Sequence, residues 1–374
     1  MRSFASKYLR DKMTALPADR DLFVQLGFRA LAAAALMFSG VAVAQEQTSP
    51  WQQGAFVYTA DELGSSISAI DLAAARVTTV PIPISPHNVQ VTADGKRLLA
   101  VGEPASDGHG HAHSRDARGA NEAKGRLLIL DTAGLGAKPV AQIVVGAHPA
   151  HVIADQRGER AFVTNAGDNT VSVVDLAAGK LIASIGTGRY PHGLRMSPDG
   201  HEVYVANVQD GTVSVIDADG LTELARIPVG TTPVQVGFTP DGSRVYASLR
   251  DENRVAVIDT ASRSLMGTIE VGRNPIQVHA TPDGRFVYVA NQGSDAEPAD
   301  TVSVIEVSSG KVVDTIRTGM GAHGVVVSGD GAWAFVTNIV DGTVSAIDVA
   351  TGKVVTTFPV GRGPNGITVR SPQG

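Results

Sequence analysis

Three histidines at alternating positions are the residues of this sequence best suited to bind a metal ion. His109, His111 and His113 lie in a polar insertion and are separated only by glycine and alanine. In an extended segment, residues at i, i+2 and i+4 point to one side, and neutral imidazole is a ligand that suits Zn, Cu and Ni. Asp107 or Asp116 adds an oxygen ligand in this interpretation. The alternative is a solvated histidine-rich loop that binds no physiological metal.

Other candidate residues follow a proline that recurs along the chain. His87, His192 and His323 come directly after this proline or after the alanine that replaces it. They are predicted to share a metal with the histidine-rich loop; the alternative is that they cap the starts of strands. Polar residues within four positions of the same proline are predicted to line a channel that binds a small ligand: His151, Arg195, Gln235, Gln277, His279 and Asn365.

The repeat that carries this proline predicts the elements that position these residues. Four of the six steps between copies are 42 residues long, and the markers are Pro86, Pro149, Pro191, Pro233, Pro275, Ala322 and Pro364. Each copy shows four short runs of alternating apolar residues. In most copies an Asp-Gly turn joins two of these runs, and glycine takes the positive φ of such a turn without strain. Seven such units predict an all-β fold, a seven-bladed β-propeller of four-stranded blades.

The ends of the repeat region predict how the ring closes. Residues 55–59 match the second strand of a unit, and residues 364–370 match a first strand. We therefore expect the C-terminal strand to join the N-terminal blade and remove two free strand edges. In this topology the inner strands line a channel, and the insertion that carries the three alternating histidines lies on the same face as His87.

The repeated strand resembles that of a known family. Val203-Tyr-Val-Ala-Asn207 has a close copy at residues 287–291, with Val-Gly-x-x-Pro and Thr-Pro-Asp-Gly between strands. This pattern resembles the YVTN family of β-propeller repeat proteins over about residues 55–370. The resemblance implies the propeller fold. Because the family includes secreted binding proteins and proteins found beside periplasmic dehydrogenases, it does not determine function.

An apolar run near the N-terminus predicts export. Residues 30–44 are apolar and end in Ala-Val-Ala, the small-x-small pattern of a signal-peptide cleavage site. The run is shorter than the about 20 residues that cross a bilayer, so we expect cleavage, a periplasmic or secreted protein and no stable membrane insertion. An uncleaved anchor is the alternative, and Met1 and Met13 are both candidate starts. The predicted segments are a signal peptide (1–44), a linker (45–54), the propeller (55–370) with insertion loops at about 103–125 and 293–300, and a tail (371–374).

Composition excludes several kinds of site. The 374 residues include no cysteine, which excludes disulfides, thiolate metal sites, a cysteine nucleophile and haem c. The net charge of −6 becomes −9 without the signal peptide, which disfavours nucleic acid as a partner. No phosphate-binding loop is present, so no nucleotide cofactor is expected.

Three functions remain. The first is an exported binding protein for Zn, Cu or Ni, such as a metallochaperone. The second is a channel-site enzyme, or an accessory protein of a periplasmic quinoprotein dehydrogenase, that acts on a small anionic ligand. The third is a scaffold for a periplasmic protein partner. The sequence has no hydrolytic motif, and its histidine pattern favours metal binding.

Overall fold

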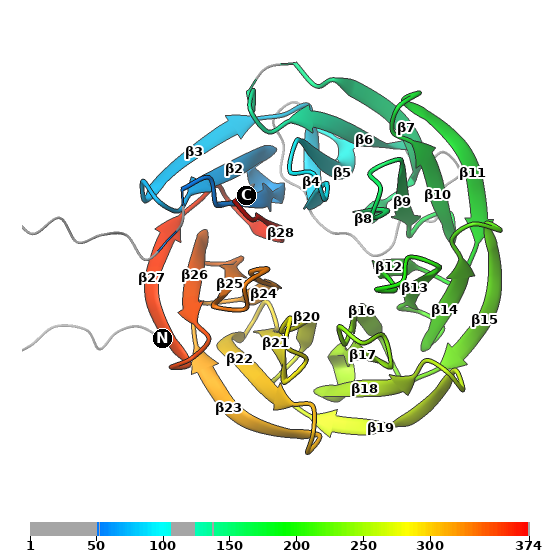
Figure 1. The fold of residues 1–374 in the computed structure, drawn as a ribbon, viewed down its shortest axis with the longest axis vertical. Helices are drawn as coiled ribbons and strands as arrows, with labels where there is room; N and C mark the ends of the chain where they lie inside the picture. Colours follow the sequence, from blue (N-terminus) through cyan, green and yellow to red (C-terminus); the bar gives the residue numbers. More distant parts are fainter. Residues whose placement is uncertain (1–50, 52, 106–123, 137, 373–374) are drawn as a thin grey trace, which may run out of the picture. The chain divides into compact units, whose positions relative to one another are not determined.

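The computed structural model describes residues 51, 53–105, 124–136 and 138–372. These residues form seven sheets of four antiparallel strands arranged in a ring (Figure 1), and the term channel refers below to the centre of this ring, which the inner strands surround. The predicted all-β, seven-bladed propeller is confirmed. The predicted signal peptide and His109, His111 and His113 lie outside the described residues. Within the described part of the chain, no helix has the length and apolar character needed to cross a membrane.

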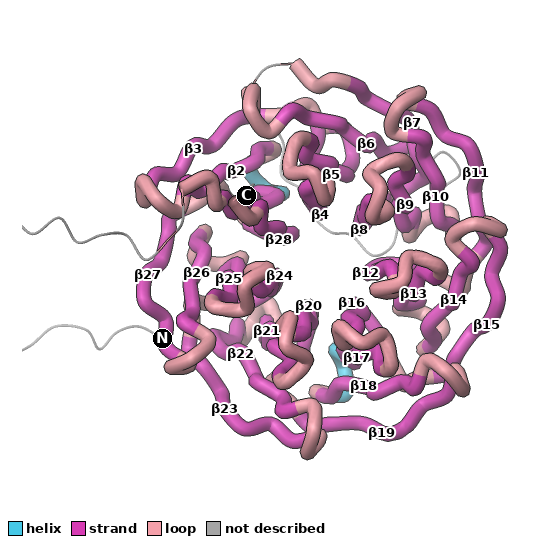
Figure 2. The backbone as a smooth tube through the Cα atoms, in the orientation of Figure 1, coloured by secondary structure: helices cyan, strands magenta, loops and turns pink. Residues whose placement is uncertain are grey.

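Every blade has the same strand order from the channel outward, which Figure 2 shows as a tube. The inner strands are β28 (Pro364–Arg370), β4 (Ile84–Val91), β8 (Pro149–Ala154), β12 (Pro191–Met196), β16 (Pro233–Phe238), β20 (Pro275–Ala280) and β24 (Ala322–Val327). The second strands are β1 (Phe56–Asp61), β5 (Arg97–Pro104), β9 (Arg160–Asn165), β13 (Glu202–Asn207), β17 (Arg244–Leu249), β21 (Phe286–Gly293) and β25 (Trp333–Asn338).

The outer half of each blade contains the remaining two strands. The third strands are β2 (Ser66–Asp71), β6 (Lys124–Asp131), β10 (Thr170–Asp175), β14 (Thr212–Asp217), β18 (Arg254–Asp259), β22 (Pro298–Glu306) and β26 (Thr343–Asp348). The outer strands are β3 (Arg76–Pro81), β7 (Ala141–Ala147), β11 (Lys180–Gly186), β15 (Thr222–Pro228), β19 (Ser264–Glu270), β23 (Lys311–Arg317) and β27 (Lys353–Pro359). Two short 3₁₀ helices, η1 (Glu62–Gly64) and η2 (Arg250–Glu252), lie between second and third strands.

The ring closes through the C-terminal strand, which confirms the sequence prediction. One sheet has the order β28-β1-β2-β3, and β28 pairs antiparallel with β1 from Phe56 opposite Arg370 to Asp61 opposite Pro364. The first and last strands of the propeller therefore hold each other by a main-chain ladder.

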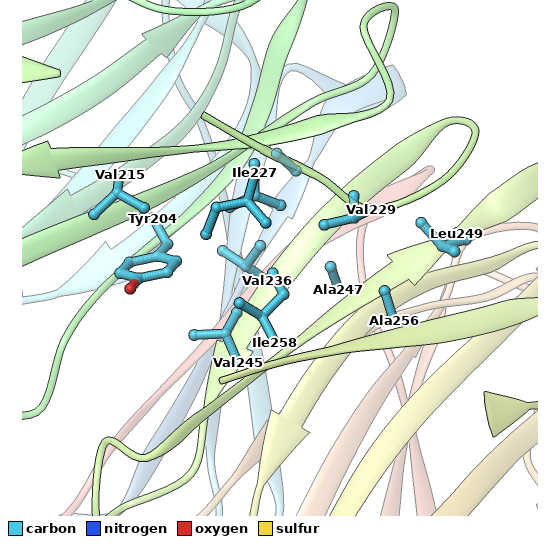
Figure 3. Close-up of a cluster of buried hydrophobic side chains, with 12 residues drawn as sticks. Tyr204, Val215, Ile227, Val229, Val236, Val245, Ala247, Leu249, Ala256 and Ile258 are labelled. Atoms are coloured by element: carbon cyan, nitrogen blue, oxygen red, sulfur yellow. The ribbon is translucent and has the colours of Figure 1, made fainter. Parts of the chain in front are cut away.

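Apolar side chains packed between neighbouring blades form the core. Because successive side chains of a strand point to opposite faces, each sheet presents apolar residues to both of its neighbours. Tyr204 and Val215 of one blade pack against Val236 and Ile258 of the next, and all four are fully buried (Figure 3). The inner strands are thereby held in place, and so are the side chains that they direct into the channel.

Half of the second predicted insertion loop, at about 293–300, is strand. Strand β21 continues to Gly293, which pairs with Pro298 at the start of β22. Only residues 294–297 form the connecting turn, so the loop is shorter than the range of about 293–300 predicted from the sequence. The inserted residues lengthen the hairpin because antiparallel pairing satisfies their backbone N–H and C=O groups. For the first insertion, β5 ends at Pro104 and β6 begins at Lys124, and residues 106–123 lie outside the described residues.

The N-terminal blade carries a buried carboxylate where four other blades carry asparagine. Asn165, at the end of β9, donates from Nδ2 to Ser172 Oγ at 2.9 Å. Asp61, at the same place in β1, accepts a hydrogen bond of 2.7 Å from Ser68 Oγ and is fully buried. Burial raises the pKa of Asp61 to about 6, although hydrogen bonds to the carboxylate oppose this. The ionised form of Asp61 is therefore disfavoured in the folded protein.

Asp61→Asn is expected to stabilise the protein at pH 7 by about 1–3 kcal/mol, since each unit of pKa shift corresponds to about 1.4 kcal/mol. The folded-state pKa lies above the ordinary value of 3.8. Stability therefore falls in the wild type as the pH rises from about 4 to above 6, and this loss is absent in the variant. Urea unfolding at pH 4 and pH 7 measures the difference. A variant no more stable than the wild type at pH 7 contradicts the prediction.

Candidate metal site at the channel mouth

Three histidines from three neighbouring blades meet at the end of the channel where the inner strands begin. His87 lies on β4, His151 on β8 and His192 on β12. One ring nitrogen of each lies within 4.8 Å of the other two. The Nε2 atoms of His87 and His192 are 3.1 Å apart, and the ring centroids of His151 and His192 are 4.9 Å apart. We call these three residues the histidine cluster.

A β-bulge at the start of the inner strands explains how residues at different repeat positions meet. His87 and His192 are one position after the recurring proline, whereas His151 is two positions after it. In a regular strand these positions face opposite sides. In all three strands the register with the second strand shifts just after the proline. A bulge interrupts the alternation, so both positions reach the channel mouth.

Hydrogen bonds hold two of the rings with Nε2 toward the cluster. His87 Nδ1 lies 3.2 Å from Glu62 Oε1, and His192 Nδ1 lies 3.1 Å from the carbonyl oxygen of Val234. Both partners accept, so each Nδ1 donates and each Nε2 retains its lone pair when the ring is neutral. Asn365 Nδ2 donates to Glu62 Oε2 at 2.7 Å and so orients the carboxylate. A carboxylate or carbonyl behind a histidine is the usual second layer of a metal site.

Burial keeps most of these rings neutral. Burial and the neighbouring His87 lower the pKa of His192 to about 3. Burial, followed by the charges of His192 and His87, holds the pKa of His151 well below its ordinary value. For His87, burial lowers the pKa, but the carboxylate of Glu62 outweighs this and the net pKa is raised. Neutral imidazoles beside one carboxylate are competent to bind a divalent cation.

The spacing of the cluster fits a small transition-metal ion. Metal–nitrogen distances of about 2.0–2.1 Å in tetrahedral geometry place ligand nitrogens about 3.3 Å apart. The pair His87–His192 is already close to this separation at 3.1 Å. His151 needs only a small side-chain adjustment, because its nitrogen lies within 4.8 Å of both.

Comparison with known proteins identifies the family to which the chain belongs. Residues 133–242 and 219–373 match the family described as YNCE-like beta-propeller. The chain belongs to this family. The resemblance to propeller repeat proteins predicted from the sequence is thereby confirmed. Among curated proteins, none matches the sequence significantly.

Solved structures with the same fold are distant in sequence. Hydrazine synthase of Kuenenia stuttgartiensis has a TM-score of 0.64 at 22 % identity, over 76 % of this chain and 89 % of its own. A functionally unknown protein from Desulfotomaculum acetoxidans has a TM-score of 0.69 at 18 % identity, over 85 % and 99 %. A putative 6-phosphogluconolactonase from Bacteroides fragilis has a TM-score of 0.65 at 16 % identity, over 85 % and 98 %. At these identities the similarity shows the fold alone.

The other residues predicted for the mouth of this YNCE-like propeller surround the cluster. Gln235 Nε2 lies 3.3 Å from His151 Nδ1, and Asn365 Nδ2 lies 3.1 Å from His87 Nδ1. His323 on β24 is 7 % exposed. Burial and the nearby His87 lower its pKa to about 4. His323 is outside the group of three whose nitrogens lie within 4.8 Å of one another.

The remaining predicted channel residues lie away from the cluster, and one cluster partner was not predicted. Gln277 is buried, and its Oε1 accepts a hydrogen bond of 3.4 Å from the backbone N–H of Val325. Arg195 and His279 line a pocket at the other end of the channel. Glu62 was missed in the sequence, although it lies in a turn between a second and a third strand, which the predicted topology places on the same face as His87.

Proposed function

We propose that this protein binds a transition-metal ion, Zn, Cu or Ni, at the mouth of its channel. The observation that carries the proposal is the convergence of His87, His151 and His192, backed by the carboxylate of Glu62. Imidazole ligands suit these three metals. Three protein ligands leave a coordination position open, whereas structural zinc sites are closed by four.

An open site at the channel mouth supports a binding protein that takes up and releases its metal, such as a metallochaperone. His109, His111 and His113 remain the sequence prediction of additional ligands. Together with the predicted signal peptide, they support a role in the periplasm or outside the cell.

Calorimetric titration of protein purified without an affinity tag tests the proposal. Zn(II), Cu(II) and Ni(II) are titrated separately, and one equivalent of at least one metal is expected to bind. Binding no tighter than about 100 µM for all three metals, an affinity too weak for a metal carrier, contradicts the proposed function.

Glu62→Gln is expected to weaken metal binding by about 10–100-fold, the usual effect of removing a partner behind a metal-binding histidine. The amide keeps the size of the side chain but removes the charge that supports Nδ1–H of His87. Glu252→Gln is the matched control, because Glu252 lies in the corresponding turn helix, η2, of another blade. Equal affinity in Glu62→Gln and wild type shows that Glu62 does not support the site.

A further inference from the structure

A pocket at the channel end opposite the histidine cluster has the features of a second ligand site. It measures about 250 Å³ and is lined by three neighbouring inner strands, β12, β16 and β20, and by the prolines of the turns that follow them. Arg195, Gly237 and His279 lie at the same level in these strands, since each pairs with the corresponding tyrosine of its second strand. An arginine and a histidine therefore flank a position that has no side chain.

Arg195 brings a positive charge into this pocket without a negative partner. Its Nη1 donates to the carbonyl oxygen of Leu194 at 3.0 Å, and no carboxylate among the described residues forms an ion pair with it. Burial lowers the pKa of Arg195 to about 10, so the guanidinium remains charged at neutral pH. A partly buried charge without a partner is costly, and a bound anion removes this cost. A guanidinium binds paired oxygen atoms through two parallel hydrogen bonds.

His279 adds a hydrogen-bond acceptor on the other side of the pocket. Its Nδ1 lies 2.9 Å from the carbonyl oxygen of Ala280, which only accepts, so Nδ1 carries the hydrogen. Burial and the charge of Arg195 lower the pKa of His279 to about 4, which leaves the ring neutral at pH 7. The Nε2 atom of a neutral ring with Nδ1–H accepts a hydrogen bond. It accepts one from a hydroxyl group but not from a fully ionised oxyanion.

Gly237 allows β16 to lie close to its neighbour β20 between these two side chains. A Cβ atom at Gly237 would lie 3.1 Å from both the side chain and the carbonyl oxygen of Val278, so no larger residue fits at this position. The pocket of about 250 Å³ admits a small ligand, with its charge toward Arg195 and its hydroxyl toward His279.

We propose that this pocket binds a small oxyanion that also carries a hydroxyl donor, with Arg195 binding the charged oxygens and His279 Nε2 accepting from the hydroxyl. Glycolate and hydrogen phosphate both have this chemistry. This pocket contains none of the residues of the histidine cluster. Anion binding in the pocket can therefore be tested independently of metal binding.

Titration with four anions at pH 7 tests the proposal. Glycolate and hydrogen phosphate carry the hydroxyl donor, whereas acetate and sulfate lack it. At least one of the first pair is expected to bind about tenfold more tightly than its counterpart, the effect of one hydrogen bond in a charged site. If glycolate matches acetate and phosphate matches sulfate, the role of His279 is wrong. If none of the four binds, the whole proposal is wrong.

Single substitutions test whether the anion binds in this pocket. Arg195→Met is expected to lower the affinity by at least about tenfold, whereas Arg273→Met, in an exposed ion pair with Glu297, leaves it unchanged. His279→Phe is expected to remove the preference for a hydroxyl donor while acetate still binds. Unchanged affinity in Arg195→Met overturns the proposal.

Thermal unfolding separates a binding role of Arg195 from a structural one. Without anion, Arg195→Met is expected to unfold at the same temperature as the wild type or a higher one, because an unpaired charge has been removed. The binding anion raises the unfolding temperature of the wild type only. A large drop for Arg195→Met without anion shows that the arginine is structural, and Arg195→Lys, which keeps the charge, then reports whether anion binding survives.

Discussion

Replacing His192 by alanine is expected to weaken metal binding at the channel mouth by about 100-fold or more. Removal of a ligand exceeds the about 10–100-fold effect of removing a partner behind it. The Nε2 atom of His192 lies 3.1 Å from that of His87, and the ring of His192 is also nearer to that of His151 than the ring of His87 is. Only two imidazoles, His87 and His151, then remain, and two ligands hold a divalent ion poorly.

The fold is expected to tolerate this change. His192 is partly exposed, and its Nδ1 bonds only the carbonyl oxygen of Val234, which faces the channel mouth. Circular dichroism and the unfolding temperature are therefore expected to stay near those of the wild type, so that a lost titration signal reports the site and not the fold.

Two further variants test whether the loss of metal binding is specific to the histidine cluster. His201→Ala removes an exposed histidine from a turn on the opposite face and is expected to bind metal as the wild type does. The triple variant of His109, His111 and His113 to alanine tests the histidine-rich loop. If the triple variant loses metal while His192→Ala retains wild-type affinity, the metal binds in the loop and the proposed cluster site is wrong.

Deleting residues 364–374 is expected to unfold the propeller at ambient temperature. The deletion removes all of β28 and leaves the edges of β1 and of the inner ring open. It also removes Ile367, which packs with Phe335 and Val57 in a buried cluster. Domain stability totals about 5–15 kcal/mol, and the loss of one strand of a closed ring, with its ladder and core contacts, is of this order.

Circular dichroism and binding of a hydrophobic dye measure this effect. The control is a deletion of residues 371–374 alone, which leaves β28 intact and is expected to melt as the wild type does. A 364–374 deletion with an unchanged melting temperature shows that ring closure through β28 contributes little to stability.

The propeller was predictable from the sequence because each blade is a local unit. The pairing within a blade depends on alternation and on turns such as Asp241-Gly242, where Asp241 Oδ1 accepts from the N–H of Ser243 and Gly242 has a φ of 71°. Both signals lie within one repeat. The hairpin at residues 293–298 was less predictable, because the same polar residues suit either a loop or a longer ladder.

The site was predictable only in part. The histidines of the cluster were singled out by their place beside the recurring proline, yet His151 was predicted for the channel wall and not for the group that contains His87 and His192. The reason is the β-bulge, which depends on how the inner strand meets its neighbour. Glu62 was missed because its role depends on the distance to His87 in a different blade.

The sequence by itself determined the seven blades, the closure by the C-terminal strand and the end of the channel at which most histidines lie, since these follow from a repeat read along the chain. The tertiary structure alone decided which side chains meet. His87, His151 and His192 come together, and Arg195 faces His279 across a glycine, because ring closure places inner strands from separate repeats side by side. The three histidines of the cluster lie 41 to 105 positions apart in the chain, and no periodicity within one repeat encodes their contact.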